Sequence, residues 1–411
     1  MFDNRGPWDA RMIERPVVSL HPDQARAEPV LASRSPGLEV LWNGVFYGFS
    51  GYAKANREIT LRLANSFRVA ITHAIDVPPP DAYSKGRVDF HLRVPVSEKA
   101  PMVRMFGPWV EKDRHKARAR RVLYTMMETE NVHPTMVGIT NDHYDELWVP
   151  TPWNRRTFQE SGCTLPIRVM PLGIDPYVFR PDGVAWLPEC YLMTTARAGA
   201  KEVPRADFLF MYVFLPSFRK AGAFLLDAFR DAFRGDPSTG LILAMTHTHA
   251  HDKALEKLRG EMKSPVWALF GEYTEHDLAA FYRACNAYVS TSKGEGWNLP
   301  MCEAAACGLP LIVPRSSCHP DVVGEDALLF EHEGWESVAE AERISPWYEN
   351  MPWPIFGKFS HDQLVAHLRD ARTREAHVRE KAERFTQRVR TEWTWDNAAR
   401  NVADRLVEIQ P

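Results

Sequence analysis

Short apolar runs alternate with amphipathic segments along most of the chain. Ala55, Ile59 and Leu63 recur at steps of four residues, the spacing of one helical face. Between such segments lie runs rich in β-branched and aromatic residues, which predict strands. The expected strands are 38–42, 69–75, 122–127, 147–150, 167–170, 208–214, 241–245, 266–270, 287–290 and 311–313. The expected helices are 52–63, 136–141, 153–161, 221–233, 252–262, 275–285 and 299–307.

This alternation indicates an α/β protein with two similar halves. Strands and helices joined by short connections predict parallel sheets that are covered by helices on both faces. The pattern runs over about 37–178 and again over 179–392, where an irregular connection is expected at 180–206. We therefore expect two Rossmann-like domains facing a cleft, with ligands at the carboxyl ends of the strands. Residues 1–36 are expected to form an irregular leader, and 360–408 charged, solvated helices.

Composition narrows the class of protein. The 411 residues are 45% hydrophobic and 25% charged, which is typical of a soluble globular chain. The net charge of −3 provides no overall positive field for nucleic acid or an anionic membrane. The six cysteines form no C-x-x-C pair, which predicts reduced structural thiols in a cytoplasmic protein. We expect no signal peptide, because residues 1–10 are polar, and no membrane span, because the longest apolar run is far shorter than the ~20 residues that a span needs. Peripheral membrane contact stays open, because the basic run 111–121 is either a solvated helix or a dock for an anionic acceptor or lipid head group.

The densest chemical signal is the segment 292–303, Ser-Lys-Gly-Glu-Gly-Trp-Asn-Leu-Pro-Met-Cys-Glu. Pro300 suits the first turn of a helix, and Asn298 is a good residue to cap it. A helix start leaves backbone N–H groups unpaired, which makes it a binding site for a diphosphate. Gly294 and Gly296 are expected to let the backbone approach such a ligand closely.

Two glutamates flank this helix start. Glu303 is positioned to accept hydrogen bonds from a ribose diol, and Glu295 from sugar hydroxyls. The backbone from Gly296 through Trp297 to Leu299 is expected to face the diphosphate. The structural alternative is a helix start with two incidental acids. The flanking glycines, the preceding strand and the alanine-rich helix favour a binding site.

In these residues the sequence resembles the retaining family-four glycosyltransferases of GT-B fold, whose donor signature is E-x7-E. Glu295 and Glu303 have that spacing. Further similar stretches are 171–181, 275–292, 310–323 and 393–395. The resemblance covers about 38–411 and implies that 393–411 form a closing helix that returns to the first domain. It implies the fold and the class of donor, but not the substrate.

A basic pair follows the first strand of the second half. Lys220 matches the family lysine that clamps the donor diphosphate, and Arg219 and Ser217 lie beside it in sequence. Family members often carry an arginine where this chain has Leu215. A basic pair at a strand end is more often a pair of exposed side chains without a binding role, so the assignment of Lys220 and Arg219 rests on the resemblance.

Two candidates come from the first half. The glycine-punctuated loop 44–52 corresponds to a family loop near the donor diphosphate and the acceptor, so Ser50 and Gly51 are expected to line the cleft. Many relatives carry a sugar-contacting histidine where this chain has Met127. The adjacent Glu128 is expected either to bind the acceptor or the sugar or to serve as a structural cap.

The sequence offers no clear metal ligands. His247, His249 and His251 alternate without an acidic or cysteine partner at ligand spacing, which favours a polar loop. The chain also lacks the Asp-x-Asp triplet that metal-dependent transferases of the other common fold use. We therefore expect metal-independent transfer without a cofactor, with a UDP- or GDP-sugar as the donor substrate.

The resemblance thus implies a hexosyltransferase that moves a sugar from a nucleotide-diphosphate sugar to an acceptor hydroxyl with retention of configuration. The departures at Met127 and Leu215 keep open a non-catalytic sugar-nucleotide binder or scaffold. A nucleotide-sugar epimerase, and a transferase acting on modified nucleic acid bases, are further alternatives, although the net charge does not favour the latter. The acceptor is left open among a glycan, a lipid-linked molecule and a small molecule. The aromatic stretch 335–353 could contact an acceptor, cap the cleft or bind a partner.

Overall fold

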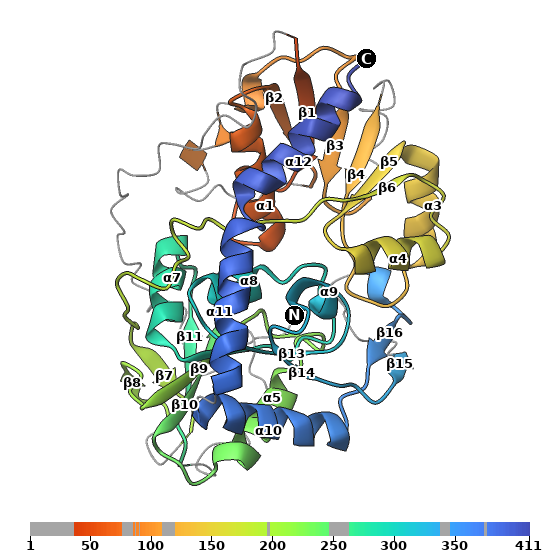
Figure 1. The fold of residues 1–411 in the computed structure, drawn as a ribbon. Coiled ribbons are helices and arrows are strands. Elements are labelled where there is room, and N and C mark those ends of the chain that lie inside the picture. The colour runs from red at the N-terminus through yellow and green to blue at the C-terminus, as the bar shows by residue number, and fades with distance from the viewer. Residues whose placement is uncertain are drawn as a thin grey trace, which may run out of the picture.

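The chain forms two large, mainly parallel β-sheets that are layered with helices (Figure 1). The computed structural model describes residues 37–75, 85–86, 88–89, 91–108, 120–194, 198–245, 263–337, 346–373 and 376–411. The expected leader 1–36, the expected helix 252–262, the histidines at 247–251 and nearly all of the basic run 111–121 lie outside the described residues.

The first sheet is parallel throughout and has the order β2-β1-β3-β4-β5-β6. Its strands are β1 (Glu39–Gly44), β2 (Arg68–His73), β3 (Met102–Met105), β4 (Arg121–Tyr124), β5 (Glu146–Val149) and β6 (Ile167–Val169). The helices of this half are α1 (Gly51–Leu63), the 3-10 helix η2 (His91–Arg93), α3 (Pro134–His143) and α4 (Pro152–Glu160). Strand β3 was not predicted, because it is only four residues long and contains Arg104. That side chain is buried and donates hydrogen bonds to Asn43 Oδ1 and to the Gly107 carbonyl, both at 2.8 Å.

The second sheet has the order β14-β13-β12-β9-β10-β11-β7-β8. Its strands are β7 (Cys190–Leu192), β8 (Lys201–Glu202), β9 (Phe208–Val213), β10 (Thr239–Met245), β11 (Val266–Phe270), β12 (Ala287–Val289), β13 (Leu311–Pro314) and β14 (Leu328–Phe330). Its helices are α5 (Gly222–Phe233), α7 (Glu275–Ala284), α8 (Leu299–Ala306) and α9 (His319–Val323).

The expectation that 180–206 is wholly irregular and that the sheets are purely parallel was wrong at one edge. Strand β7 pairs antiparallel with β11, and β8 pairs antiparallel with β7. These strands are three and two residues long, so they are too short for the period-two pattern by which strands are recognised.

Strand order fixes where a ligand can meet the second sheet. Strand β9 lies between β10, which follows it in the chain, and β12, which is reached only after β11. The connections after β9 and β12 therefore leave the same sheet edge in opposite directions. A crevice forms at such a switch point, and open α/β sheets bind ligands there. The segments that follow β9 and β12 contain Lys220 and Glu295.

The chain passes twice between the two sheets. The first passage runs through Ile174 and the second through Trp393 and Trp395. The two run side by side, because the Ile174 N–H donates to the Trp393 carbonyl at 2.9 Å and the Trp395 N–H donates to the Ile174 carbonyl at 3.1 Å. After the second passage α12 packs against α1, and Arg405 forms a 2.5 Å ion pair with the buried Glu146. The expected domain limits at 178 and 392 stand as a proposal.

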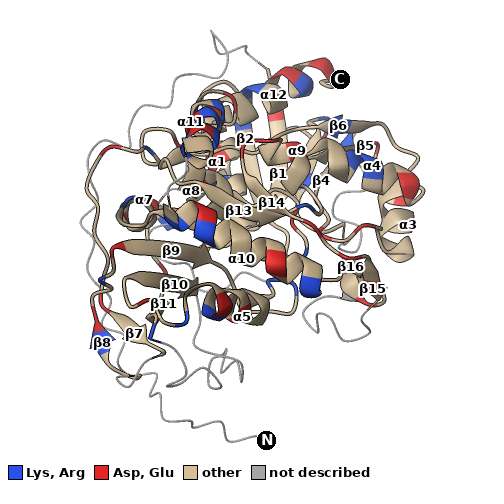
Figure 2. Cartoon of the chain, turned by 60° about the horizontal axis from the view of Figure 1, so that its bottom comes forward, with Lys and Arg blue, Asp and Glu red and all other residues tan. Residues whose placement is uncertain are grey.

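Three helices close the chain, and Figure 1 shows α11 and α12 in succession along one side of the molecule. They are α10 (Lys358–Thr373), α11 (Ala376–Thr391) and α12 (Trp395–Glu408). Lys and Arg alternate with Asp and Glu along α10 and α11 (Figure 2), as expected for solvated helix faces rather than an anion-binding patch. Each helix also has a buried apolar face, such as Val378 and Phe385 of α11. No helix among the described residues has the length and apolarity to cross a bilayer.

Candidate functional site

The predicted basic pair is anchored at the carboxyl end of β9. The Tyr212 hydroxyl and Thr291 Oγ1 donate to the Lys220 carbonyl at 3.0 and 3.1 Å. The Lys293 N–H donates to the Arg219 carbonyl at 2.7 Å. These bonds tie the segment after β9 to the segment after β12, so the site is built on two neighbouring strands of one sheet.

Glu295 lies between the two basic side chains. Its Oε1 contacts Lys220 Nζ and is 3.3 Å from Arg219 Nη1, which also donates to the Gly294 carbonyl at 2.7 Å. Only 10–19% of each of the three side chains is exposed. Burial alone would raise the pKa of Glu295, but Lys220 and Arg219 together lower it to about 2. Lys220 and Arg219 therefore both contact this one carboxylate.

Glu128 reaches the same group from the first half. Its carboxylate accepts a hydrogen bond from the Tyr348 hydroxyl. Burial raises the pKa of Glu128, and the nearby Arg219 opposes that shift. The Tyr348 ring lies edge-on to Trp353, at 5.6 Å between ring centroids, and Trp353 lies edge-on to Phe218 at 6.1 Å. Part of the aromatic stretch 335–353 therefore borders the charged group.

That aromatic stretch belongs to a small two-stranded sheet beside the site. Strands β15 (Trp335–Ser337) and β16 (Pro352–Pro354) pair antiparallel, and the 3-10 helix η3 (Pro346–Tyr348) lies between them in sequence. Lys293 fixes this sheet to the segment after β12, because Lys293 Nζ is 2.7 Å from both Glu336 Oε1 and the Pro354 carbonyl. These strands were not predicted from the sequence.

Backbone strain is concentrated around the charged group. Three of the four non-glycine residues with positive φ in the described part of the chain are Ala221, Asn298 and Ser317. Ala221 begins α5 directly after Lys220, and Asn298 caps α8. A left-handed conformation costs an alanine or serine roughly 1–2 kcal/mol. Such strain persists only where the surroundings impose it, and it is frequent at functional sites.

The start of α8 is held by a buried histidine. Asn298 Oδ1 accepts from the Met301 N–H at 3.4 Å, as the sequence predicted for a cap. The Asn298 amide nitrogen is 3.0 Å from His319 Nε2, and His319 Nδ1 is 3.1 Å from the Ser316 carbonyl. A carbonyl only accepts, so this network assigns the proton to Nδ1. Burial lowers the pKa of His319 to about 4, so the ring is neutral near pH 7.

Glu303 belongs to a second group of contacts, one turn into α8. Its Oε1 is 2.5 Å from Lys54 Nζ of α1, and its Oε2 accepts from the Tyr282 hydroxyl at 3.3 Å. Lys54 was not predicted as a site residue. A single lysine in a helix carries no sequence signal for such a role.

The structure gives the two glycines of the motif a packing role that the sequence did not predict. A Cβ at Gly294 would lie 1.7 Å from the Glu128 carbonyl oxygen, and one at Gly296 would lie 2.5 Å from Met126 side-chain atoms. The space where a side chain would lie at either glycine is therefore filled by the segment after β4. Gly294 must be a glycine because it contacts the backbone of the other half directly.

Asn154 connects the same two segments, and it too was not predicted. Its Oδ1 accepts from the Met127 N–H at 2.7 Å, and its Nδ2 donates to the Gly296 carbonyl at 3.1 Å. Asn154 is fully buried at the start of α4. Met127 is also buried and packs in an apolar cluster, so its side chain does not replace the histidine of the relatives.

The remaining predicted residues lie at the edges of this arrangement. Ser50 Oγ accepts from the Ala53 N–H at 3.2 Å and so caps α1. A Cβ at Gly51 would meet Leu299 at 3.5 Å, which places this loop against the start of α8. Ser217 is partly exposed in the turn before Lys220. Trp297 is buried against Trp393, so only its backbone could face a ligand.

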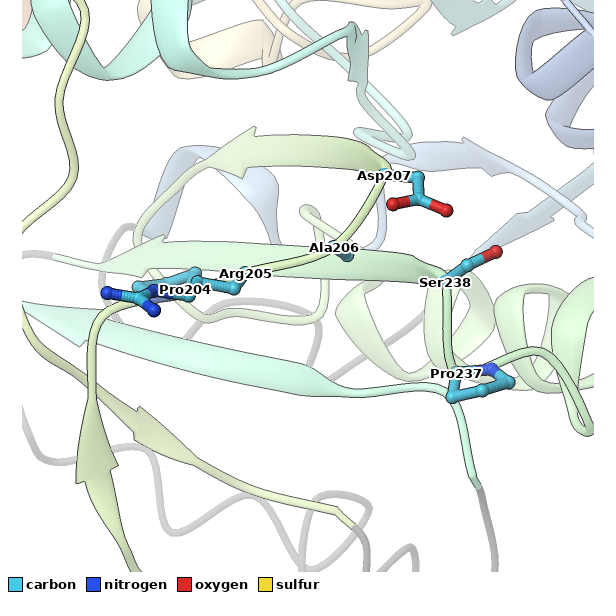
Figure 3. Close-up of a pocket in the computed structure, with 6 residues that line it drawn as sticks. All are labelled: Pro204, Arg205, Ala206, Asp207, Pro237 and Ser238. Carbon is cyan, nitrogen blue, oxygen red and sulfur yellow. The ribbon is translucent and has the colours of Figure 1, made fainter.

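Two surface pockets lie away from these residues. The larger, of about 610 Å³, is lined by residues that precede β9 and β10 (Figure 3). It therefore lies at the amino ends of these strands, opposite the edge that holds Lys220 and Glu295. The smaller, of about 230 Å³, involves Pro181, Arg283 and Arg379. None of the predicted site residues lines either pocket. Among the described residues, no three His, Cys, Asp or Glu side chains are grouped as ligands for a metal ion.

Comparison with known proteins finds a likeness over part of this chain. Residues 207–344 match the family described as glycosyl transferases group 1. This region contains both sides of the charged group and the 292–303 segment. The serotype-specific mannosyltransferase WbdA of Escherichia coli is 28% identical over 162 residues, which are 36% of this chain and 20% of that protein. The chain thus matches about a fifth of the length of this curated relative.

Solved structures extend the likeness to nearly the whole fold. Sucrose-phosphate synthase from Thermosynechococcus elongatus has a TM-score of 0.60 at 12% identity, covering 90% of this chain and 98% of that one. The E. coli trehalose-6-phosphate structure bound with UDP-2-fluoro glucose has a TM-score of 0.62 at 12% identity, covering 90% and 99%. The fold is therefore GT-B, as predicted, with two Rossmann-like sheets.

Proposed function

We propose that this protein is a glycosyltransferase that moves a sugar from a nucleotide-diphosphate donor to an acceptor hydroxyl, with retention of configuration. The observation that carries the proposal is the convergence of Lys220 and Arg219 on Glu295 at the switch point of a GT-B fold. Glu303 follows at the E-x7-E spacing, and the region matches the group 1 glycosyl transferases.

The donor is proposed to lie along the start of α8. Its diphosphate would contact Lys220, Arg219 and the N–H groups near Asn298, where a helix start favours anions. Glu303 would bind the ribose diol. Glu295, which pairs with Lys220 when no donor is bound, would turn to the hydroxyls of the sugar. Because these side chains are largely buried, the two halves must part to admit the donor.

The chemistry follows from charge. Breaking the bond between the anomeric carbon and the phosphate oxygen moves negative charge onto the diphosphate and leaves positive charge on the sugar. Preorganised cations and N–H donors stabilise that departing charge, and loss of one such donor commonly costs on the order of a hundredfold in rate. The acceptor oxygen bonds to the anomeric carbon, and its proton passes to the departing phosphate oxygen. No metal ion is required in this scheme, because Lys220 and Arg219 provide the positive charge.

One alternative is supported by a specific observation. Met127 is buried in an apolar cluster, and Leu215 is 47% exposed, so neither position provides the polar group that relatives carry there. A sugar-nucleotide binder without transferase activity would tolerate both changes. Donor hydrolysis separates the two candidates, since transferases release nucleotide slowly when water replaces the acceptor.

The test uses the purified full chain with UDP-, GDP-, ADP- and TDP-sugars, with and without EDTA, and follows free nucleotide by mass spectrometry. The panel includes a mannose donor, since WbdA is a mannosyltransferase, and a glucose donor. We expect turnover of one donor in EDTA, a lower rate in Lys220→Ala, and weaker donor binding in Glu303→Ala. Lys201→Ala is the matched control, because Lys201 of β8 forms an exposed ion pair with Glu189, away from the site.

Each outcome decides between the candidates. Turnover that Lys220→Ala lowers and Lys201→Ala leaves unchanged supports the transferase. Donor binding without turnover favours the binder. Wild-type affinity and rate in both Lys220→Ala and Glu303→Ala would refute the assignment of the site.

A further inference from the structure

Lys54 joins the first half of the chain to the glutamate expected to hold the donor ribose. It lies in the first turn of α1, and its Nζ is 2.5 Å from Glu303 Oε1 and 2.9 Å from Glu275 Oε1. The same Nζ lies 4.6 Å from the centre of the Phe179 ring. Only 10% of the Lys54 side chain is exposed, and 5% of the Glu303 side chain.

A lysine in this position is held in its charged form. Burial opposes the charge, but the carboxylates of Glu275 and Glu303 raise the pKa of Lys54 above its usual range. Lys54 is therefore held as a cation that donates to Glu303.

The contacts on Glu303 leave it able to bind more. A carboxylate has about four acceptor positions, two on each oxygen. Lys54 takes one on Oε1 and the Tyr282 hydroxyl takes one on Oε2. Both donors come from buried side chains, so they fix the plane of the carboxylate. With respect to the described residues, one acceptor position remains on each oxygen, and this pair matches the two adjacent hydroxyls of a ribose.

We infer that Lys54 is a positioning residue, which orients Glu303 so that its free acceptor positions meet the 2′- and 3′-hydroxyls of the donor ribose. This inference rests on the proposed function. It adds that the ribose site belongs to both halves of the chain, because α1 supplies the lysine and α8 the glutamate. The site is complete only when α1 lies against α8.

The experiment separates a positioning role from a merely structural one by removing the diol from the ligand. Binding of the nucleoside diphosphate, and of its 2′,3′-dideoxy counterpart, is measured by calorimetry on wild type, Lys54→Met and Lys54→Arg. Arg62→Met is the matched control. Arg62 lies on the same helix and pairs with Glu58 and with Asp396 of α12, away from Glu303.

We expect Lys54→Met to weaken binding of the nucleoside diphosphate on the order of tenfold or more, as for loss of a charge-assisted contact. Binding of the dideoxy compound should change by less than about threefold, because that ligand does not use Glu303. Lys54→Arg should recover part of the loss, and Arg62→Met should leave both affinities near wild type. Should Lys54→Met fold poorly, Tyr282→Phe removes the other donor to Glu303 and should show the same preference for the intact ribose.

Equal losses for the two ligands would overturn the role of Lys54 while leaving the proposed function intact. If wild type bound the two ligands with equal affinity, no carboxylate would contact the ribose diol. That outcome would also overturn the role of Lys54 while leaving the proposed function intact. If wild type binds none of the UDP, GDP, ADP and TDP ligands, the proposed function itself fails, and the inference fails with it.

Discussion

Replacing Gly294 by alanine tests whether the contact between the two halves sets the geometry of the site. The new Cβ would lie 1.7 Å from the Glu128 carbonyl oxygen, whereas real Cβ atoms essentially never approach within 3.0 Å. The obstacle is backbone, so no side-chain rotation relieves it. The segment after β12 must therefore move away from the segment after β4 by about 1.3 Å, the difference between these two distances.

The expected cost has two parts. Overpacking of this kind typically lowers the free energy of unfolding by about 1–3 kcal/mol. The displaced segment carries Glu295 and the carbonyl that binds Arg219, and a shift of about 1 Å in a positioned group can lower a rate about a hundredfold. We therefore expect Gly294→Ala to lower the kcat/KM of donor turnover about a hundredfold, measured beside thermal unfolding.

Gly138→Ala is the control. Gly138 lies in α3 with open space around it, and alanine in a helix interior should stabilise by about 0.5–1 kcal/mol without touching the site. A Gly294→Ala protein that keeps its kcat/KM within threefold would refute the reasoning, even with a lower unfolding temperature. That result would mean that the observed contact is a packing feature on which turnover does not depend.

Three further changes test the neighbourhood of the site. Asn154→Asp should lose about 1–3 kcal/mol of stability and at least tenfold in turnover, since a carboxylate replaces the buried amide donor. The control is Asn141→Asp, which changes a partly exposed amide and should be near neutral. Similar losses in the two variants would contradict the role of Asn154. His319 stays neutral down to about pH 4 when folded, whereas an unfolded histidine takes up a proton near pH 6.5, so stability should fall by about 2 kcal/mol between pH 6.5 and 5. Thermal unfolding measured as a function of pH should show a smaller loss of stability between pH 6.5 and 5 in His319→Gln than in wild type. An equal loss in the two proteins would disprove the role of the ring. Tyr348→Phe should cost about 1–3 kcal/mol, and this cost should vanish in a Glu128→Ala background; additive costs would refute the pairing.

Most of the architecture could be predicted from the sequence because buried parallel strands have a strong local signature. The strand predicted at 266–270 has those bounds as β11, and the helix predicted at 275–285 ends one residue earlier as α7. The strands that were missed are short, or carry a polar residue that the fold satisfies from a distance. Arg104 in β3 is the example, since its partner Asn43 lies on the neighbouring strand.

The candidate site could be predicted from the sequence only where its residues lie close together in the chain. The segment 292–303 contains its glycines, cap and acids within twelve residues, so its helix start could be located from the sequence. Lys54 and Asn154 act across the interface between the halves, on partners far away in the chain. No local pattern records such a contact. The same limit applies to the packing role of Gly294, whose neighbour Glu128 is distant in sequence.

The paired passages at Ile174 and Trp395 have a consequence for anyone who engineers this protein. Since the last helix rests on the first half, the second half is an insertion whose two ends leave and re-enter at one place. A hybrid that exchanges this half with another chain needs two junctions, one near 175 and one near 394, and a single crossover would separate α12 from α1. The two junctions lie side by side and are joined by backbone hydrogen bonds. A hybrid that keeps both would therefore connect its two parts at one small site.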